Sequence, residues 1–322
     1  MKTPITTATT LAATLLLLAT TAANATTILF VGNSFTYGEP AGATGRNVQT
    51  YQPGTVTDLN KTNVGGVPAL FKQFTVELGL DYQVSLETVG GTGLDYHYTQ
   101  KLPLINQPWD KVVLQSYSTL DSANPGNPDK LKTYSALLTG ALAKTNPAVD
   151  IFLDATWSRA DLTYKNASPW LGQPIDAMEK SVQAGYEQAA AVSSNVRGVI
   201  RVGAAWNDAI TTGLADANPY DGIDPGKINL WAPEGYHASP YGYYLEALME
   251  LGQVTGYDPR LLGSSESAAA YFGFTAAQTT ALQQVAYNQL TSVPEPGSLL
   301  LLTVGLAGLA YARSRPKQAA TA

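Results

Sequence analysis

A short apolar strand that ends in a serine turn constrains this chain more than any other stretch. Residues 28–31 are four apolar residues, typical of a buried strand, and they run directly into Gly32-Asn33-Ser34. Glycine adopts backbone angles that a side chain forbids, so we expect Gly32 to allow a tight turn at the carboxyl end of the strand. Open α/β sheets bind ligands at that edge. Ser34 is therefore a candidate nucleophile, although the same tripeptide also fits an ordinary turn.

Strand and helix signals alternate along the rest of the chain. The expected strands cover residues 28–31, 82–89, 111–115, 149–153 and 199–202. The expected helices cover residues 67–78, 94–105, 129–144, 175–192 and 241–254. This alternation predicts an α/β fold with three layers, in which helices cover both faces of a central parallel sheet of about five strands. Residues 39–63 show no helical periodicity, which predicts a loop or small hairpin beside the serine.

The N-terminal residues 1–25 have the features of a secretory signal peptide. A basic Lys2 precedes an apolar run, and the segment ends in Ala-Asn-Ala, a small-x-small cleavage site. We therefore expect signal peptidase to cut after Ala25. The alternative is a buried first helix.

The C-terminal residues 293–317 combine a Pro-Glu-Pro motif, an uncharged apolar stretch of about 15 residues and a basic end. Such a stretch is short for a bilayer, which needs about 20 residues. The combination closely resembles the PEP-CTERM sorting signal of Gram-negative bacteria. That resemblance implies recognition by a membrane-bound exosortase, cleavage near Pro294 to Pro296, and delivery to the cell surface or extracellular matrix. An ordinary membrane anchor is the alternative, and it would also place the domain outside the cytoplasm.

Between these two signals, one domain is expected over residues 26–262, since no repeat or low-complexity block interrupts the pattern. Residues 263–292 are rich in Ala and Gln and helical in period. They are either a helical extension packed on the domain or a spacer before the sorting signal, and the sequence leaves both open.

Composition excludes several classes of function. Without the terminal signals the chain has 15 basic against 24 acidic residues, so nucleic acid is not an expected partner. The chain has no cysteine, which excludes disulfides and thiolate metal sites. It has two histidines, so a catalytic zinc would need mostly carboxylate ligands. We therefore expect neither a catalytic metal nor another cofactor.

The candidate serine needs a base, because a hydroxyl is a poor nucleophile near neutral pH. His237 lies two residues before Ser239, and Ser239 and Pro240 are a good N-cap and a good first residue for the helix expected next. This places His237 on a loop at a helix start. Glu234, three residues earlier, can fold back to orient the ring. The alternative is that His237 is only a loop residue.

Four sequence blocks resemble the SGNH (GDSL-type) hydrolase family, in particular its branch with GNS at the nucleophile turn. The blocks are GNSFT at residues 32–36, GGTG at 90–93, a third strand ending at Gln115, and EGYHASPYGYYLEAL at 234–248. The similarity spans roughly residues 28–251. It implies a flavodoxin-like fold and the hydrolysis of carboxylic esters.

The resemblance also implies roles for single residues. Ser34 would be the nucleophile, and its backbone N–H one oxyanion donor. Gly91 would supply a second backbone N–H. The family's acid and base lie three residues apart, and Glu234 and His237 match that spacing.

The chain departs from the family at two positions. The acid is usually aspartate, so Asp221 or Asp224, in a turn-rich run, are alternatives to Glu234 for orienting the histidine. The third block normally offers an asparagine amide as a third oxyanion donor. This chain has Gln115 there, and its amide is our candidate donor.

Four further residues are candidates for binding the substrate. Trp157 and Arg159 follow the fourth expected strand and should lie at the active edge of the sheet. Tyr37 could add to an aromatic wall. His97 comes one helical turn after Gly91, where it either lines the cleft or packs a helix on the sheet.

The expected function is that of an exported carbohydrate esterase, which removes small acyl groups such as acetyl from a surface or matrix polysaccharide. Tyrosine is abundant, 18 against 7 phenylalanines, which is compatible with a surface that faces sugars. A lipolytic or aryl esterase on the same scaffold is one alternative. A non-catalytic module that binds acylated glycan is another.

Overall fold

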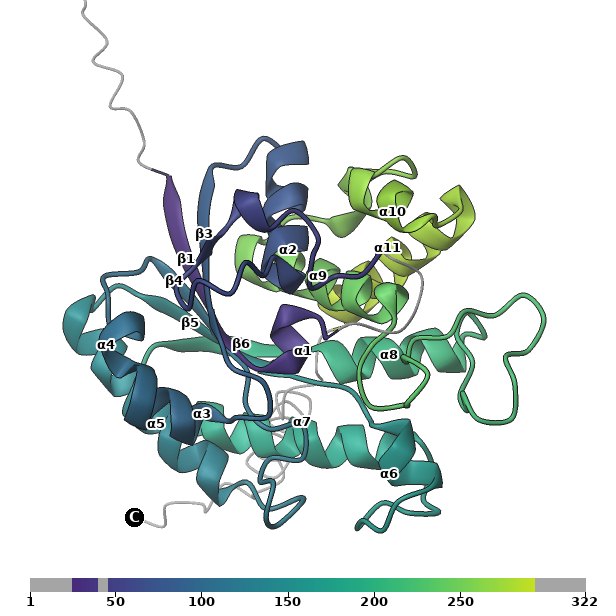
Figure 1. Cartoon of the computed structure of the whole chain (residues 1–322), viewed down its shortest axis with the longest axis horizontal. Helices are drawn as coiled ribbons and strands as arrows, with labels where there is room; N and C mark the ends of the chain where they lie inside the picture. The colour runs from purple at the N-terminus through teal and green to yellow at the C-terminus, as the bar shows by residue number, and fades with distance from the viewer. Residues whose placement is uncertain (1–24, 40–45, 293–322) are drawn as a thin grey trace, which may run out of the picture.

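A parallel sheet of six strands runs through the middle of the molecule (Figure 1). The computed structural model describes residues 25–39 and 46–292. The strands are β1 (Thr26–Gly32), β2 (Thr57–Asp58), β3 (Tyr82–Thr88), β4 (Lys111–Leu114), β5 (Asp150–Ala155) and β6 (Val196–Arg201). They lie in the order β2-β3-β1-β4-β5-β6, and every pairing is parallel. Without the edge strand β2 this is the flavodoxin-like order, so the predicted fold class is confirmed.

The sixth strand, β2, was not predicted. It comprises only Thr57 and Asp58, which pair in parallel with β3 inside the segment expected to be a loop or hairpin. The segment is therefore not a hairpin. Two residues are too few to show the alternation by which a strand is recognised in a sequence.

Helices cover both faces of the sheet, which makes the three layers that the sequence predicts (Figure 1). The longer helices are α2 (Gly66–Glu77), α5 (Asp129–Thr145), α7 (Asp176–Ala191), α8 (Val202–Thr211), α9 (Pro240–Thr255) and α11 (Ala276–Thr291). The shorter ones are α1 (Ser34–Tyr37), α3 (Leu94–Tyr96), α4 (Leu102–Ile105), α6 (Ala160–Tyr164) and α10 (Ser267–Phe272), with single turns η1 (Pro53–Thr55), η2 (His97–Lys101) and η3 (Pro259–Leu262).

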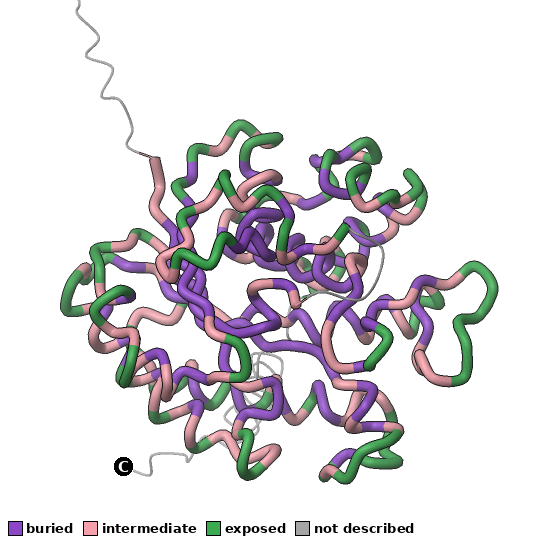
Figure 2. Tube along the Cα trace, in the orientation of Figure 1, coloured by how far each residue is buried: buried purple, intermediate pink, exposed green. Residues whose placement is uncertain are grey.

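Strand β1 is buried on both faces, as the purple trace at the centre of Figure 2 shows. Its alternate residues face opposite layers, because successive side chains of a strand point to opposite sides. Ile28 and Phe30 pack in the core that includes α2, α8 and α9. Leu29 and Val31 pack in the core that includes α5 and α7. A continuous apolar run is what such a position requires.

Helix α9 begins where the sequence predicts a helix, within one residue. The Ser239 hydroxyl accepts hydrogen bonds from the N–H groups of Tyr241 and Gly242, and Pro240 is the first helical residue. The helix packs between α2, α8 and α11, and twelve of its sixteen residues are buried.

The C-terminal helices belong to the folded domain. Thr275 and Gln278 form a capping box at the start of α11. This helix packs on α8 and α9, and its Leu282 is completely buried. Residues 263–292 are therefore a packed helical extension and not a spacer.

Both expected targeting signals fall largely outside the described residues, at positions 1–24 and 293–322. Within the described ranges, none of the helices is both long enough and apolar enough to cross a membrane.

Candidate active site

Ser34 lies immediately beyond the carboxyl end of β1, as the first residue of α1. Asn33 caps this short helix, and its Oδ1 accepts the Phe35 N–H at 3.1 Å. Gly38 ends the helix with a φ of 73°, and its N–H donates to the Ser34 carbonyl. Two caps thus hold a four-residue helix with the serine at the edge where ligands bind in open α/β sheets. Ser34 is 5% exposed.

Gly32 is needed for a different reason from the one predicted. Its φ is not among the positive ones in the chain, so the expectation of a special backbone angle is wrong. A β-carbon at Gly32 would lie 2.1 Å from Thr36 Oγ1 and 2.7 Å from Gln115 Oε1. The missing side chain leaves room for these two groups beneath the serine turn.

Asn33 connects the serine turn to the two neighbouring loops. Its Nδ2 donates to the Thr92 carbonyl at 2.8 Å and to the Ser116 carbonyl at 3.1 Å. These carbonyls belong to the loops that follow β3 and β4, the two strands beside β1. The sequence predicts no role for Asn33. Its only signal in the sequence is that a polar residue stands between Gly32 and the serine.

Gln115 supports the serine turn, and the prediction that its amide is an oxyanion donor is wrong. The residue is 1% exposed. Its Oε1 accepts the Asn33 N–H at 2.9 Å and the Thr36 hydroxyl at 3.2 Å. Its Nε2 is hydrogen-bonded to the Ser116 carbonyl. Both ends of the amide are therefore engaged with the protein and turned away from solvent.

His237 and Glu234 meet as the sequence predicts they can. Glu234 Oε1 lies 2.9 Å from His237 Nδ1 and also accepts the backbone N–H of His237 at 3.2 Å. This contact favours the tautomer with the proton on Nδ1, so that Nε2 carries a free lone pair. Nε2 is buried and has no hydrogen-bond partner among the described residues. A buried imidazole nitrogen without a partner has the arrangement of a base that awaits a proton.

Neither alternative carboxylate contacts the histidine. Asp221 accepts a hydrogen bond from Asn218 Nδ2, and Asp224 pairs with Lys227 at 2.8 Å. Glu234 is therefore the carboxylate that the structure places against the His237 ring.

Ser34 and His237 lie in one neighbourhood of the fold. The ring of Phe35, the next residue after the serine, is 5.6 Å from the His237 ring between centroids. The Tyr243 hydroxyl, on the helix that follows the histidine loop, donates to the Ser34 carbonyl at 3.3 Å. Tyr236 stacks on the His237 ring at 4.2 Å and also lies 5.4 Å from the Phe35 ring, so the three rings form one cluster. No hydrogen bond joins Ser34 Oγ to His237 in the described residues, and such bonds are often long before a substrate binds.

A cleft of about 240 Å³ adjoins the serine turn. It is lined by Asn33, Gly91, Tyr117, Ser118, Thr119, Ser122, Pro125, Arg159, Leu162 and Tyr236. Gly91 has a φ of 71° and is exposed, and a β-carbon there would meet no other atom within 4 Å. Neither the Gly91 nor the Ser34 N–H donates to another atom of the described chain. Both N–H groups are therefore free to bind a developing oxyanion.

Two of the predicted substrate-binding residues are buried, and that prediction is wrong for them. Trp157 is completely buried and stacks on Trp206 at 4.5 Å. His97 is completely buried as well. Arg159 does line the cleft, where its guanidinium lies 3.6 Å from the centre of the Tyr236 ring.

Tyr37 lines a second cavity, of about 440 Å³, on the other side of the glycine turn. Its hydroxyl donates to the Glu39 carboxylate. Burial and this carboxylate raise the pKa of the Tyr37 phenol well above its ordinary value. The phenol therefore stays protonated and remains a hydrogen-bond donor at neutral pH.

His97 belongs to a hydrogen-bonded network beneath the glycine turn. Its Nδ1 lies 2.5 Å from Glu87 Oε2, and its Nε2 lies 3.1 Å from Thr92 Oγ1. Asn60 Nδ2 donates to the other Glu87 oxygen, and Lys101 donates to Asn60 Oδ1. The network holds Thr92, whose carbonyl accepts from the serine turn, in place.

We expect His97→Ala to lower the free energy of unfolding by about 3–5 kcal/mol, because it leaves the carboxylate of Glu87 buried without its partner. Urea or thermal unfolding measures this loss. Gln100→Ala, at an exposed position of the same segment, is the matched control and should change stability by less than about 0.5 kcal/mol. A loss below about 1 kcal/mol at position 97 would contradict the structural role.

One group of residues in the described part of the chain is spaced to hold a metal ion. It consists of Asp154, Glu246 and Glu250, which offer ligand atoms within 4.8 Å of one another. Neither histidine belongs to it.

The comparisons with known proteins agree with this architecture. Residues 292–315 match the PEP-CTERM protein-sorting motif, which confirms the sequence prediction. This motif indicates export and surface sorting. No curated protein sequence matches the chain.

Three solved structures illustrate the structural similarity. A DUF4886 family protein from Bacteroides uniformis superposes with a TM-score of 0.55 at 16% identity, over 83% of this chain and 95% of that one. A protein described as a GDSL-like lipase, from Parabacteroides merdae, gives 0.46 at 15% identity over 72% and 95%. A family 3 carbohydrate esterase from Clostridium thermocellum gives 0.42 at 16% identity over 70% and 92%. The chain thus joins a PEP-CTERM protein-sorting motif to an α/β domain that shares its fold with the DUF4886 family protein.

Proposed function

We propose that the domain is a serine esterase of the SGNH type, in which Ser34 is the nucleophile, His237 the general base and Glu234 the residue that orients the base. The observation that carries the proposal is the His237 ring, bonded through Nδ1 to Glu234 while its buried Nε2 has no partner among the described residues. A histidine that only capped a loop would have no need of a carboxylate on one nitrogen and a free lone pair on the other.

The reaction proceeds by acyl transfer in two halves. His237 Nε2 takes the Ser34 proton while Oγ attacks the ester carbonyl, and the N–H groups of Ser34 and Gly91 stabilise the oxyanion. The ester C–O bond then breaks, and His237 returns the proton to the leaving alcohol. Water attacks the acyl-enzyme with the same base and releases the acid.

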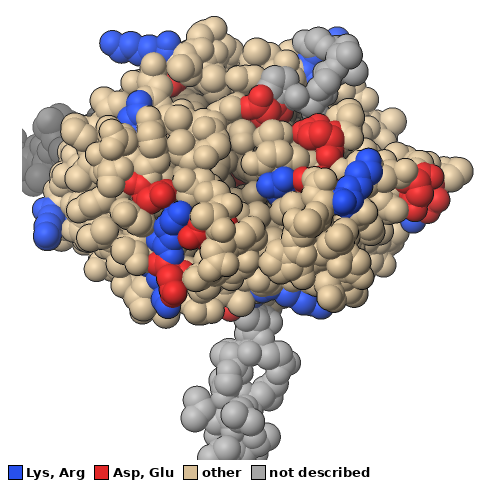
Figure 3. Space-filling model, turned by 60° about the horizontal axis from the view of Figure 1, so that its bottom comes forward, with Lys and Arg blue, Asp and Glu red and all other residues tan. Residues whose placement is uncertain are grey.

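The cleft favours a small, polar substrate. Five of its ten lining residues carry a hydroxyl group, and the apolar Pro125 and Leu162 lie beside them. Charged side chains of both signs lie in small scattered groups on the face shown in Figure 3. We propose that the substrate is an acylated, in particular acetylated, polysaccharide at the cell surface or in the matrix.

Export completes the proposal. Signal peptidase would remove the first 25 residues, and an exosortase would recognise the C-terminal motif and cut near Pro294 to Pro296. The chemistry would then take place outside the cytoplasm.

A fluorophosphonate probe tests the enzyme directly, since it labels activated serines. We expect labelling of the purified protein, loss of labelling in Ser34→Ala, and retention in Ser122→Ala, which changes an exposed serine of the same cleft. Absence of labelling across neutral and alkaline pH would overturn the proposal in favour of a glycan-binding module, a role that the missing Ser34–His237 hydrogen bond also fits. Faster turnover of long-chain esters than of acetylated sugars would instead indicate a lipolytic or aryl esterase.

A further inference from the structure

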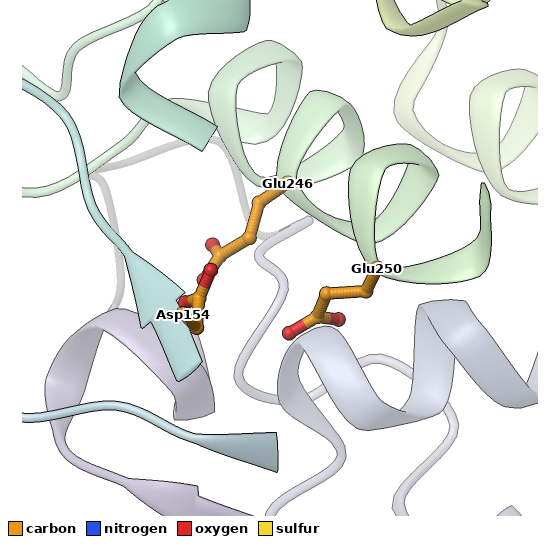
Figure 4. Close-up of side chains that lie close together, drawn as sticks. All are labelled: Asp154, Glu246 and Glu250. Atoms are coloured by element: carbon orange, nitrogen blue, oxygen red, sulfur yellow. The ribbon is translucent and has the colours of Figure 1, made fainter. Parts of the chain in front are cut away.

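Three acidic side chains converge in the interior, between the sheet and helix α9 (Figure 4). Asp154 lies on β5, while Glu246 and Glu250 lie one turn apart on α9 and therefore share a face of that helix. The three residues are 1%, 0% and 1% exposed. None of them belongs to the serine site.

No cationic side chain compensates these carboxylates for their burial in the described part of the chain, and Asp154 lies near enough to Glu246 for the two to share a hydrogen bond once one of them is protonated. Both oxygens of Asp154, both of Glu246 and Oε2 of Glu250 are buried and have no hydrogen-bond partner in the described part of the chain. No lysine, arginine or histidine of the described residues forms an ion pair with any of the three. Buried carboxylates require a counter-charge, a donor or a proton, and the described residues supply neither a counter-charge nor a neutral donor here.

We propose that Asp154, Glu246 and Glu250 bind a calcium ion that fastens helix α9 to strand β5. One oxygen of each residue lies within 4.8 Å of the other two, so an ion between the three would be no more than about 2.8 Å from each, close to the Ca–O range of roughly 2.3–2.6 Å. A single ion between them therefore reaches all three. The oxygens of these carboxylates are also buried and without partners among the described residues, and they point toward one another, which indicates a bound cation.

The donor set selects among metals. All three ligands are carboxylates, which favour hard cations over zinc or copper. Magnesium demands near-octahedral geometry and retains several waters, whereas calcium accepts irregular sets of protein oxygens. The ligands here are 1% exposed or less, so a site that leaves little room for bound water suits calcium better than magnesium.

Protonation is the competing way to neutralise the cluster. Burial raises the pKa of the Asp154 carboxyl to about 7, and burial with the neighbouring carboxylates raises the pKa values of Glu246 and Glu250 well above their ordinary range. Without a cation the cluster would hold protons at neutral pH. The calcium-bound cluster and the protonated cluster can be distinguished, because only in the first case does the protein contain Ca²⁺ and respond to it.

The ion would act on the fold and not on the reaction. Helix α9 begins directly after the loop of His237, and its Tyr243 donates to the Ser34 carbonyl. Glu246 lies three residues beyond Tyr243, so the cluster adjoins the contact between α9 and the serine turn.

The test is metal content and thermal stability of the full-length purified protein. We expect elemental analysis to find about one Ca²⁺ per chain. After unfolding and refolding in EDTA, added CaCl₂ at about a hundredfold over Kd should raise Tm by roughly 5–10 °C, and MgCl₂ by much less. Protein free of calcium whose Tm is unchanged by CaCl₂ would overturn the proposal and indicate shared protons. An equal response to magnesium would also overturn the assignment to calcium.

Neutral variants separate the site from other acidic groups. Glu250→Gln and Asp154→Asn should abolish both the bound Ca²⁺ and the Tm response, and because they remove repulsion they should still fold. Glu187→Gln, which changes a half-exposed glutamate on α7, should keep both. Retention of calcium in Glu250→Gln and Asp154→Asn alike would place the ion elsewhere and contradict the proposal.

Discussion

His237→Ala is expected to lower kcat by at least about 10³-fold while the protein keeps its fold. The Ser34 hydroxyl would lose the group that takes its proton, and the leaving alcohol the group that returns it. The cost in stability should be about 1 kcal/mol, because the histidine side chain lies on a loop and its polar bond is to the half-exposed Glu234. Steady-state hydrolysis of p-nitrophenyl acetate measures the first effect, and a thermal melt the second.

The variant Glu234→Gln tests whether Glu234 orients His237. Glutamine can still accept a hydrogen bond from the histidine, but it cannot stabilise the charged ring, so we expect a fall in kcat between about 10²- and 10⁴-fold. Near-normal activity would move the orienting role to another carboxylate or to a backbone carbonyl. Activity of His237→Ala within about tenfold of the unchanged protein would contradict the role of the histidine itself.

The fold could be predicted because its signals are local. The apolar residues of β1 are buried on both faces, so its uninterrupted hydrophobic run correctly predicts a central strand. The start of α9 is determined by Ser239 and Pro240, whose capping chemistry depends on no distant residue. The edge strand β2 escaped prediction because its two residues pair with a strand about 28 positions away and show no pattern of their own.

The site was predictable only as far as short-range geometry determines it. Glu234 and His237 are three residues apart on one loop, so their contact depends on local folding. Gln115 has the chemistry of an oxyanion donor, but its direction is determined by Asn33 and Thr36, about 80 residues away. The burial of Trp157 likewise depends on its stacking against a tryptophan on α8, which the sequence around it does not reveal.

The acidic cluster was hidden for a related reason. Glu246 and Glu250 stand four residues apart in a helix, a spacing that is equally typical of a solvated face. Because that face of α9 packs toward Asp154 on β5, both glutamates are buried. The burial of the two carboxylates therefore depends on tertiary packing and not on their spacing in the sequence.

Asn33→Asp should damage the protein more than its small chemical change implies. The Asn33 amide donates to two carbonyl oxygens, those of Thr92 and Ser116, at 2.8 and 3.1 Å. An ionised carboxylate in its place can still cap the helix by accepting the Phe35 N–H, but it would face two acceptors and donate to neither. Since Asn33 is 3% exposed, we expect a loss of about 3 kcal/mol in the free energy of unfolding.

The same change should lower kcat, because the two bonds hold the serine turn against the loop that carries Gly91. If this alignment of the two loops is lost, the two proposed oxyanion donors no longer converge, and removal of one such donor costs about 10²–10³-fold in a serine protease. Thermal melts and p-nitrophenyl acetate hydrolysis measure the two effects. The matched control is Asn127→Asp, since Asn127 uses only its Oδ1, as acceptor of the Asp129 N–H, and aspartate preserves that bond.

The pH dependence of Asn33→Asp separates the loss of donors from a general disturbance of packing. A carboxyl group that faces two carbonyl oxygens is favoured in its protonated form, because the acid proton restores one of the lost donations. Its folded-state pKa therefore lies above the unfolded value, so the deficit should be smallest at pH 4 and grow as the pH rises toward 8. A deficit that stays constant over this range, or a variant as stable and active as Asn127→Asp, would show that the turn does not depend on the two amide bonds.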